Sequence, residues 1–175
     1  LYISLSLKYS FNASKELKII IENYLVPYLE KNIFGCYIQC QNVKIYKTIG
    51  EVLIEKVSWL WHFDNNPKEQ IKVMIYLNDV NDNGPFKYLS KDNEAIKIKT
   101  SKKDHKSWIQ GNQAHFETLG KKWKGTRVPK HIISNLQSKN EVIEKDIKGP
   151  AGTAILFDNN IIHRGTIPLK GFRYA

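Results

Sequence analysis

Cysteine, methionine and long apolar runs are scarce in this sequence. Its 175 residues include 2 cysteines and 1 methionine, and no apolar run approaches the roughly 20 residues that a membrane-spanning helix needs. Cys36 and Cys40 stand in a segment that favours strand, where their spacing puts them on one face but too far apart for an easy disulfide. We therefore expect two reduced core cysteines and a soluble protein. No secretory leader pattern is visible, so a cytoplasmic location is expected.

Acidic residues are few relative to basic ones. The chain has 27 Lys and Arg against 17 Asp and Glu, a formal net charge of +10. Most of this excess lies between Lys87 and Lys148, a stretch with 15 basic and 7 acidic residues. Such a balance favours an anionic partner, either an anionic small-molecule substrate or nucleic acid.

The length of the chain suits one domain with a real core. The sequence begins at Leu1 without an initiator methionine and ends two residues after Arg173. We therefore expect a single domain over residues 1–175 that is a fragment, or the ordered part, of a longer chain. No pattern indicates the oligomeric state.

The chain is predicted to open with a helix and to continue mainly in strands. Ser14 can cap a helix that Pro27 should kink or end. The apolar residues of this helix recur at the three-and-four spacing of one buried face: Leu17, Ile20, Ile21, Tyr24, Leu25 and Tyr28. Strand-forming residues then dominate six segments: 36–46, 52–64, 71–80, 153–157, 161–166 and the residues from 171. Turn signals occupy 81–85 and 158–160.

The lysine-rich residues 87–148 show weak periodicity, and we expect an insertion of short helices and loops there. Around it, many short strands with little helix beyond the first indicate a mainly β fold. The architecture that fits best is an antiparallel double-stranded β-helix, the cupin-like jelly roll, with its site inside the open end.

Residues 61–64, Trp-His-Phe-Asp, carry the first chemical signal. On a strand, His62 and Asp64 point to one face while the two aromatic residues pack on the other. A third ligand must come from another segment, and His163 is the best candidate because it interrupts an otherwise apolar strand. Two histidines and one carboxylate form the facial triad of non-haem iron(II) oxygenases, which leaves metal positions open. His62, Asp64 and His163 are the predicted metal ligands and catalytic residues.

The open metal positions suit 2-oxoglutarate, which fills two of them as a chelate, and dioxygen, which takes the third. The far carboxylate of 2-oxoglutarate then needs a cation. Arg173 follows His163 by ten residues, and a guanidinium can meet a carboxylate with two parallel hydrogen bonds. Arg173 is therefore predicted to anchor the co-substrate.

Three further residues are candidate co-substrate contacts. Tyr76 and Asn78 alternate onto one face of the 71–80 strand, and they reach the co-substrate if that face is the interior. Thr166 follows His163 by three residues and is similarly placed. The bland interpretation of each is ordinary packing or a polar strand end. Trp59 and Trp61 are expected to belong to the core rather than to a substrate platform.

At these residues the chain resembles the phytanoyl-CoA dioxygenase-like family of iron(II) and 2-oxoglutarate-dependent oxygenases. The matching segments are 61–64, 72–80 with 83–86, and 152–173. The resemblance implies the jelly roll, iron(II), and the roles given above to the two histidines, Asp64 and Arg173.

Two features bear on the reaction. Where the family usually carries a Pro-Gly-Ser-His turn after Gly-Pro, this chain has Tyr-Leu-Ser-Lys-Asp at 88–92, so an acyl-CoA substrate is not implied. Related halogenases replace the metal-binding carboxylate by a small residue so that chloride can bind the iron. Because Asp64 is present, hydroxylation is favoured over halogenation.

The expected function is thus hydroxylation of an anionic small molecule, dependent on iron(II), 2-oxoglutarate and dioxygen, with release of succinate and carbon dioxide. The identity of the primary substrate is open. The alternative is a non-catalytic jelly-roll module whose basic stretch binds nucleic acid or another polyanion. The aromatic residues of that stretch form no recognisable nucleic-acid motif, which favours the oxygenase.

Overall fold

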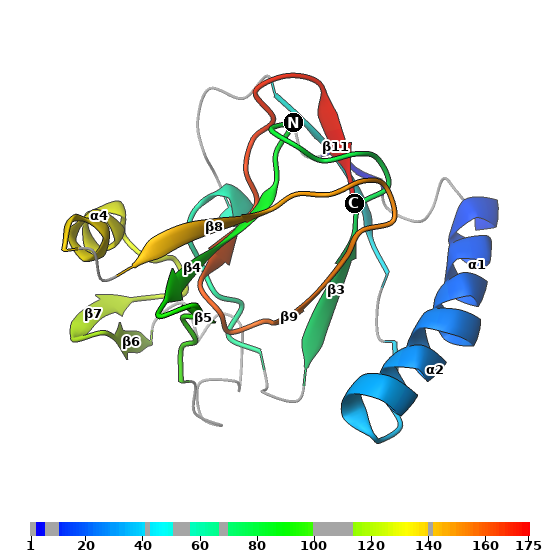
Figure 1. Ribbon diagram of the computed structural model, residues 1–175, viewed down its shortest axis with the longest axis horizontal. Coiled ribbons are helices and arrows are strands. Elements are labelled where there is room, and N and C mark those ends of the chain that lie inside the picture. The colour runs from blue at the N-terminus through cyan, green and yellow to red at the C-terminus, as the bar shows by residue number, and fades with distance from the viewer. Residues whose placement is uncertain are drawn as a thin grey trace. The chain divides into compact units, whose positions relative to one another are not determined.

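The computed structural model describes residues 3–5, 11–40, 43–50, 57–66, 70–99, 114–139 and 142–175 (Figure 1). The chain divides into two compact units, one formed by Tyr2–Lys47 and the other by Thr48–Ala175 together with Leu1. Within the described residues, no helix is both long enough and apolar enough to cross a membrane.

The N-terminal unit contains one long helical segment and a strand pair. The helical segment runs through α1 (Phe11–Ile20), the π-helical turn η1 (Ile21–Leu25), α2 (Val26–Leu29) and a second π-helical turn η2 (Glu30–Phe34). Gly35 then adopts a left-handed conformation with φ of 62° and ends the segment. Strand β1 (Ile3–Leu5) pairs antiparallel with β2 (Ile45–Ile49).

The predicted start of this helix is wrong, because the helix begins at Phe11, three residues before the expected cap at Ser14. Pro27, which was expected to kink or end the helix, lies within the helical segment and does not end it. The π-helical turn directly before α2 shifts the hydrogen-bond pattern, which accommodates the missing proline N–H. That turn also breaks the regular helical period. Of the predicted buried face, Ile21 is buried, whereas Tyr24 is 71% exposed.

Two further predictions for this unit are wrong. Residues 36–40 and 43–44 carry no strand, and regular pairing begins only at Ile45. Cys36 is exposed and Cys40 is half-buried, so neither is a core residue, although both are free thiols. High strand propensity alone does not make a strand, because strand formation depends on the packing and pairing around it.

The C-terminal unit is mainly β, with antiparallel sheets compatible with a β-sandwich. Strand β3 (Ile71–Ile75) pairs with β9 (Ala154–Asp158), with Ile71 opposite Asp158 and Ile75 opposite Ala154. Strand β4 (Phe86–Lys91) pairs with β5 (Glu94–Ala95), β8 (Ile143–Ile147) and β10 (His163–Arg164). The remaining elements are a 3-10 turn η3 (Val57–Trp59), the β6–β7 hairpin (His115–Thr118 and Lys121–Lys124), α4 (Lys130–Ser138) and β11 (Phe172–Tyr174).

The predictions for this unit are partly confirmed. The strands expected at 71–80, 153–157, 161–166 and from 171 exist as β3, β9, β10 and β11, although β3 ends at Ile75 and β10 has two residues. The segment 57–66 contains no regular strand, and the rest of the strand predicted at 52–64 lies outside the described residues.

The expectation of short helices and loops over 87–148 is met by α4 but missed the strands that the described part also contains. Strands β4 and β8 lie in this stretch, and β4 also pairs with β10, which carries His163. The basic stretch therefore contributes strands to the same sheet as a predicted ligand. The sequence did not indicate these strands, because β8 has three consecutive charged residues (Glu-Lys-Asp at 144–146) and β4 shows no strict alternation of charged and apolar residues.

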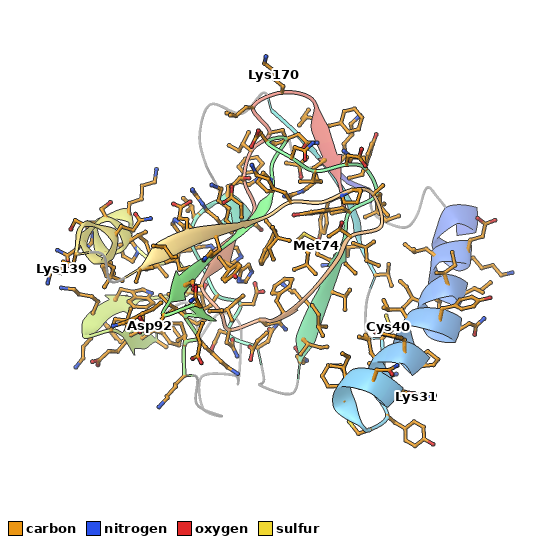
Figure 2. The ribbon with its side chains drawn as sticks, viewed as in Figure 1. Lys31, Cys40, Met74, Asp92, Lys139 and Lys170 are labelled. Atoms are coloured by element: carbon orange, nitrogen blue, oxygen red, sulfur yellow. The ribbon has the colours of Figure 1, made fainter. Side chains whose placement is uncertain are left out.

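Two apolar clusters form the core of this unit. The first packs around Trp61, Phe63, Leu89, Phe116 and Ile162. The second fills the space between the β3–β9 pair and β4, and it includes Tyr76, Phe86, Ile155 and Phe157. Figure 2 shows Met74 of β3 pointing into this space, where it packs against the second cluster. The segment 61–64 lies between the two clusters, because its alternate residues face opposite ways.

Phe63 tests this arrangement. Its ring is fully buried and lies 4.6 Å from Phe116, centroid to centroid, in an edge-on contact. Phe63→Ala should lower the free energy of unfolding by about 3–5 kcal/mol, because it opens a cavity behind His62 and Asp64. Urea unfolding measures the loss. Leu77→Ala, at a side chain that is 46% exposed, should cost under about 1 kcal/mol; equal losses in the two variants would contradict the assigned core.

Candidate metal centre

The backbone brings His62 and His163 together in an isolated antiparallel bridge. The His62 N–H donates to the His163 carbonyl at 3.0 Å, and the His163 N–H donates to the His62 carbonyl at 2.8 Å. Residues paired in this way point to the same face of an antiparallel ladder. The ring centroids are accordingly 4.4 Å apart.

Asp64 joins the two histidines from two residues along the chain. Its N–H donates to the Asn159 carbonyl at 2.9 Å, which keeps residues 62–64 extended beside the segment leading to His163. Its side chain therefore returns to the face of His62. The carboxylate oxygens lie 3.8 Å from His62 Nε2 and 3.6 Å from His163 Nε2. The structure thus assembles all three predicted ligands, here called the His–Asp–His cluster, with ligand atoms within 4.8 Å of one another.

Both imidazoles are oriented by backbone carbonyls. His62 Nδ1 lies 2.7 Å from the Leu60 carbonyl oxygen, and His163 Nδ1 lies 2.9 Å from that of Ile161. Because a carbonyl oxygen can only accept, each Nδ1 carries the proton and donates. The lone pair of each ring is then on Nε2, the atom that faces Asp64.

Aromatic rings close the cluster on the side of the second apolar core. Phe86 stacks on His163 with centroids 5.4 Å apart, and Phe157 meets the same ring edge-on at 5.2 Å. His62 and His163 are each 4% exposed, whereas the Asp64 side chain is 14% exposed. The cluster is therefore largely buried, and the Asp64 carboxylate is its most exposed part.

Burial fixes the charges of the cluster. Burial, aided by the neighbouring His163, lowers the pKa of His62 to about 3. Burial likewise lowers the pKa of His163. Burial raises the pKa of Asp64, but the lysine at position 72 and the two histidines outweigh it, so this pKa falls below its ordinary value. At neutral pH the cluster therefore offers two neutral imidazoles and one carboxylate, the protonation states that a divalent metal ion requires.

Lys72 is the one cation that touches the cluster directly among the described residues. Its Nζ lies 2.6 Å from Asp64 Oδ2, and its side chain is 46% exposed. Sequence alternation put Lys72 on the same face as Tyr76, but it gave no sign of this contact. The ammonium holds the carboxylate oxygen that a bound metal would also use.

Arg173 is buried beside the strand that carries His163. Its Nη1 donates to the Gly84 carbonyl, and its Nη2 lies 3.4 Å from Thr48 Oγ1. A Cβ on Gly165 would lie 3.4 Å from Nη2, so the guanidinium sits against the end of β10. The structure thus places Arg173 next to the segment of His163.

Tyr76, Asn78 and Thr166 use their polar atoms on the backbone. The Tyr76 hydroxyl donates to the Ile147 carbonyl at 2.8 Å and accepts the Phe86 N–H at 2.9 Å. Asn78 Oδ1 accepts the Tyr174 N–H at 2.6 Å, and Thr166 Oγ1 donates to the Pro85 carbonyl at 2.7 Å. In the part of the chain that is described, none of the three bonds to the His–Asp–His cluster. These contacts fit ordinary packing or a polar strand end, and the predicted contact of the three residues with the co-substrate stays a prediction.

The two tryptophans belong to the core, as predicted. Trp59 is 4% exposed and Trp61 is 6% exposed.

Comparison with protein-family models and with curated proteins finds no match for this chain.

Removal of Lys72 should strengthen metal binding. Lys72→Met takes away a positive charge that competes for Asp64 Oδ2, and we expect the affinity for Co(II) to rise on the order of tenfold, since a half-exposed lysine is screened and can swing away. Co(II) titration followed by visible absorption measures the affinity. Lys97→Met is the matched control, because Lys97 is similarly exposed at 49% and pairs with Asp158 instead. An unchanged affinity in Lys72→Met would show that the lysine does not compete with the metal, and a weaker affinity would show that it supports the site.

Proposed function

We propose that this protein is a non-haem iron(II), 2-oxoglutarate-dependent oxygenase that hydroxylates an anionic small molecule. The observation that carries the proposal is the convergence of one ionised carboxylate with the Nε2 atoms of two buried histidines whose rings are oriented by backbone carbonyls. Two imidazoles and a carboxylate on one side of a metal are the donor set of the 2-His-1-carboxylate iron enzymes. The residues present therefore fit iron(II).

The fold supports the same proposal. The ligands come from two neighbouring extended segments at the end of a space bounded by β3, β9 and β4, as the open end of a jelly roll would supply them. We infer that the antiparallel strands form a double-stranded β-helix. The resemblance of residues 61–64, 72–80 and 152–173 to the phytanoyl-CoA dioxygenase-like family points the same way.

The chain's own residues would have three tasks. The Leu60 and Ile161 carbonyls hold the two imidazoles in one tautomer and one orientation. Phe86 and Phe157 keep water from His163, which strengthens electrostatic interactions inside the pocket. Arg173 carries a buried positive charge that suits the far carboxylate of 2-oxoglutarate. When bound, iron(II) with 2-oxoglutarate and dioxygen supplies the oxidative decarboxylation that gives succinate, carbon dioxide and the hydroxylated product.

Asp64 makes hydroxylation the favoured outcome over halogenation, because its carboxylate would fill the metal position that chloride needs.

The polyanion-binding alternative has less support. Several lysines of the basic stretch form ion pairs within the protein: Lys87 with Glu144 and Asp146, Lys122 with Glu117, and Lys148 with Asp82. Such pairs reduce the field that a polyanion would meet.

Anaerobic titration with iron(II) and 2-oxoglutarate tests the proposal. The chelate gives a weak visible metal-to-ligand charge-transfer band, which should appear in the protein and vanish in His62→Ala. His115→Ala is the matched control, because His115 is an exposed histidine of β6 and should leave the band intact. Folded protein that binds iron(II) but never gives the band would rule out 2-oxoglutarate as co-substrate.

Arg173 should affect the affinity for 2-oxoglutarate and leave the affinity for iron(II) unchanged. Arg173→Lys keeps a cation but loses the two-pronged contact, and Arg173→Ala should weaken 2-oxoglutarate binding by about 2–5 kcal/mol. Iron(II) affinity should stay constant in both variants, which separates a lost carboxylate contact from a disturbed fold. The titration above measures both affinities. Unchanged 2-oxoglutarate affinity in Arg173→Ala would assign Arg173 to structure only.

A further inference from the structure

Lys72 is a charged residue on an otherwise apolar face of the β3–β9 pair. It lies opposite Phe157, and Met74 lies opposite Ile155. Side chains of directly opposite residues share one face of a sheet, and the other three of these residues pack in the second apolar cluster. Figure 2 shows Met74 pointing into the space that this cluster fills. The face that carries Lys72 is therefore the face that turns toward the core.

The Lys72 side chain reaches from this apolar face to a predicted metal ligand. Its Nζ lies 2.6 Å from Asp64 Oδ2, the same oxygen that lies 3.6 Å from His163 Nε2. The stem of a lysine can pack along apolar surface while its ammonium stays at a polar rim. The lysine side chain is 46% exposed, so it meets the cluster at the carboxylate, where the cluster is most accessible to solvent.

Asp64 is the one acidic partner of the Lys72 ammonium within the part of the chain that is described. The other acidic residue of the β3–β9 pair is Asp158. It lies opposite Ile71, hence on the other face of the pair, and its carboxylate pairs with Lys97. If the ammonium leaves Asp64, strands β3 and β9 therefore offer it no second carboxylate on its own face.

A divalent metal ion in the His–Asp–His cluster would compete with this ion pair. The metal ion needs a carboxylate oxygen of Asp64 together with the two Nε2 atoms, and the ammonium already holds Oδ2. Two cations that share one carboxylate repel each other, and partial burial strengthens the repulsion. Because a lysine has a flexible stem, its ammonium can swing off the carboxylate while the metal ion stays. Metal binding should therefore release the Lys72 ammonium beside the metal.

A released ammonium next to a divalent cation favours an anion as its new partner. A carboxylate or phosphate accepts charge-assisted hydrogen bonds from the ammonium, which are stronger than those of neutral groups. The same anion also reduces the repulsion between the two cations. A neutral group would leave both charges uncompensated. The metal-loaded cluster should therefore prefer an oxyanion at this place, whereas the metal-free cluster already supplies one in Asp64.

We propose that Lys72 selects an anionic primary substrate. In the metal-free protein its ammonium pairs with Asp64, and after metal binding it binds a carboxylate or phosphate group of the substrate. The identification of this anion as the substrate rests on the proposed oxygenase function; the metal-dependent binding of an oxyanion at Lys72 does not. In this account Arg173 serves 2-oxoglutarate and Lys72 serves the primary substrate.

Binding of simple probes tests the inference. Calorimetric titrations with benzoate, phenyl phosphate and neutral benzyl alcohol compare a carboxylate, a phosphate and an uncharged group, each with metal-free and with Co(II)-loaded protein. We expect Co(II) to tighten the binding of at least one anion by about tenfold or more, the gain typical of a hydrogen bond to a charged group. The alcohol should bind both forms equally. The anion with the larger gain identifies the source of the oxyanion.

Variants assign the gain to Lys72. Lys72→Met should abolish it, and Lys72→Arg, which keeps a cation, should retain it. Lys97→Met is the matched control, because Lys97 is similarly exposed at 49% and pairs with Asp158. A gain that persists in Lys72→Met would show that the anion binds the metal or another cation, and it would overturn the inference. The absence of a gain in the unaltered protein, or an equal loss in Lys97→Met, would overturn it too.

Reciprocity supplies a second measurement. An anion that binds tighter when Co(II) is present must raise the affinity for Co(II) by the same factor. This effect should occur in the unaltered protein and be absent in Lys72→Met. The affinity of the iron(II)-loaded protein for 2-oxoglutarate should fall less than about threefold in Lys72→Met, the screened effect of a half-exposed charge. A loss as large as that of the probe anion would assign Lys72 to the co-substrate and overturn the inference.

The two proposals fail separately. Anion binding that depends on both Co(II) and Lys72, with no charge-transfer band from iron(II) and 2-oxoglutarate, upholds the Lys72 site and removes the oxygenase. A charge-transfer band together with anion binding that is indifferent to Lys72 upholds the oxygenase and removes Lys72 as its specificity residue. Folded protein that binds neither Co(II) nor iron(II) overturns both.

Discussion

Two backbone hydrogen bonds between His62 and His163 are the constraint on which the site depends. They join segments 101 residues apart in the chain, and they set the two imidazoles side by side before any ligand is present. The Asp64 side chain lies on the same face as His62, because an extended backbone returns every second side chain to the same face. Trp61 and Phe63, which alternate with His62 and Asp64, pack into the first apolar cluster and hold this segment against the core. Loss of the pairing would separate the ligands even if each residue stayed intact.

Charge is distributed around this frame in a consistent way. The buried imidazoles stay neutral and the carboxylate stays ionised, so the cluster carries one negative charge at neutral pH. Cations surround it: Lys72 touches the carboxylate, and Arg127 flanks His62. An anionic cluster with two cations beside it suits a metal ion that also binds further anionic ligands. The excess of basic residues in the sequence is thus used partly near the centre and partly in internal ion pairs.

The convergence of His62, Asp64 and His163 was predictable from the sequence, whereas the scaffold around them was only partly so. His62 and Asp64 share a face under any extended conformation, so the absence of a regular strand at 57–66 did not matter. The helix limits failed because π-helical turns have no distinct sequence signal. Strands β4 and β8 were missed because their pairing partners, not their propensities, make them strands. The contact of Lys72 with Asp64 joins two segments whose spacing in space no periodicity encodes.

X-ray absorption at the iron edge of anaerobically loaded protein tests the central claim most directly. Imidazole ligands give outer-shell scattering from the far atoms of the ring, and the number of such ligands can be counted. The His–Asp–His cluster predicts two imidazoles together with oxygen ligands, and a single imidazole in His163→Ala. Bound iron without imidazole scattering, or with scattering unchanged in His163→Ala, would contradict the assignment of the metal to His62, Asp64 and His163.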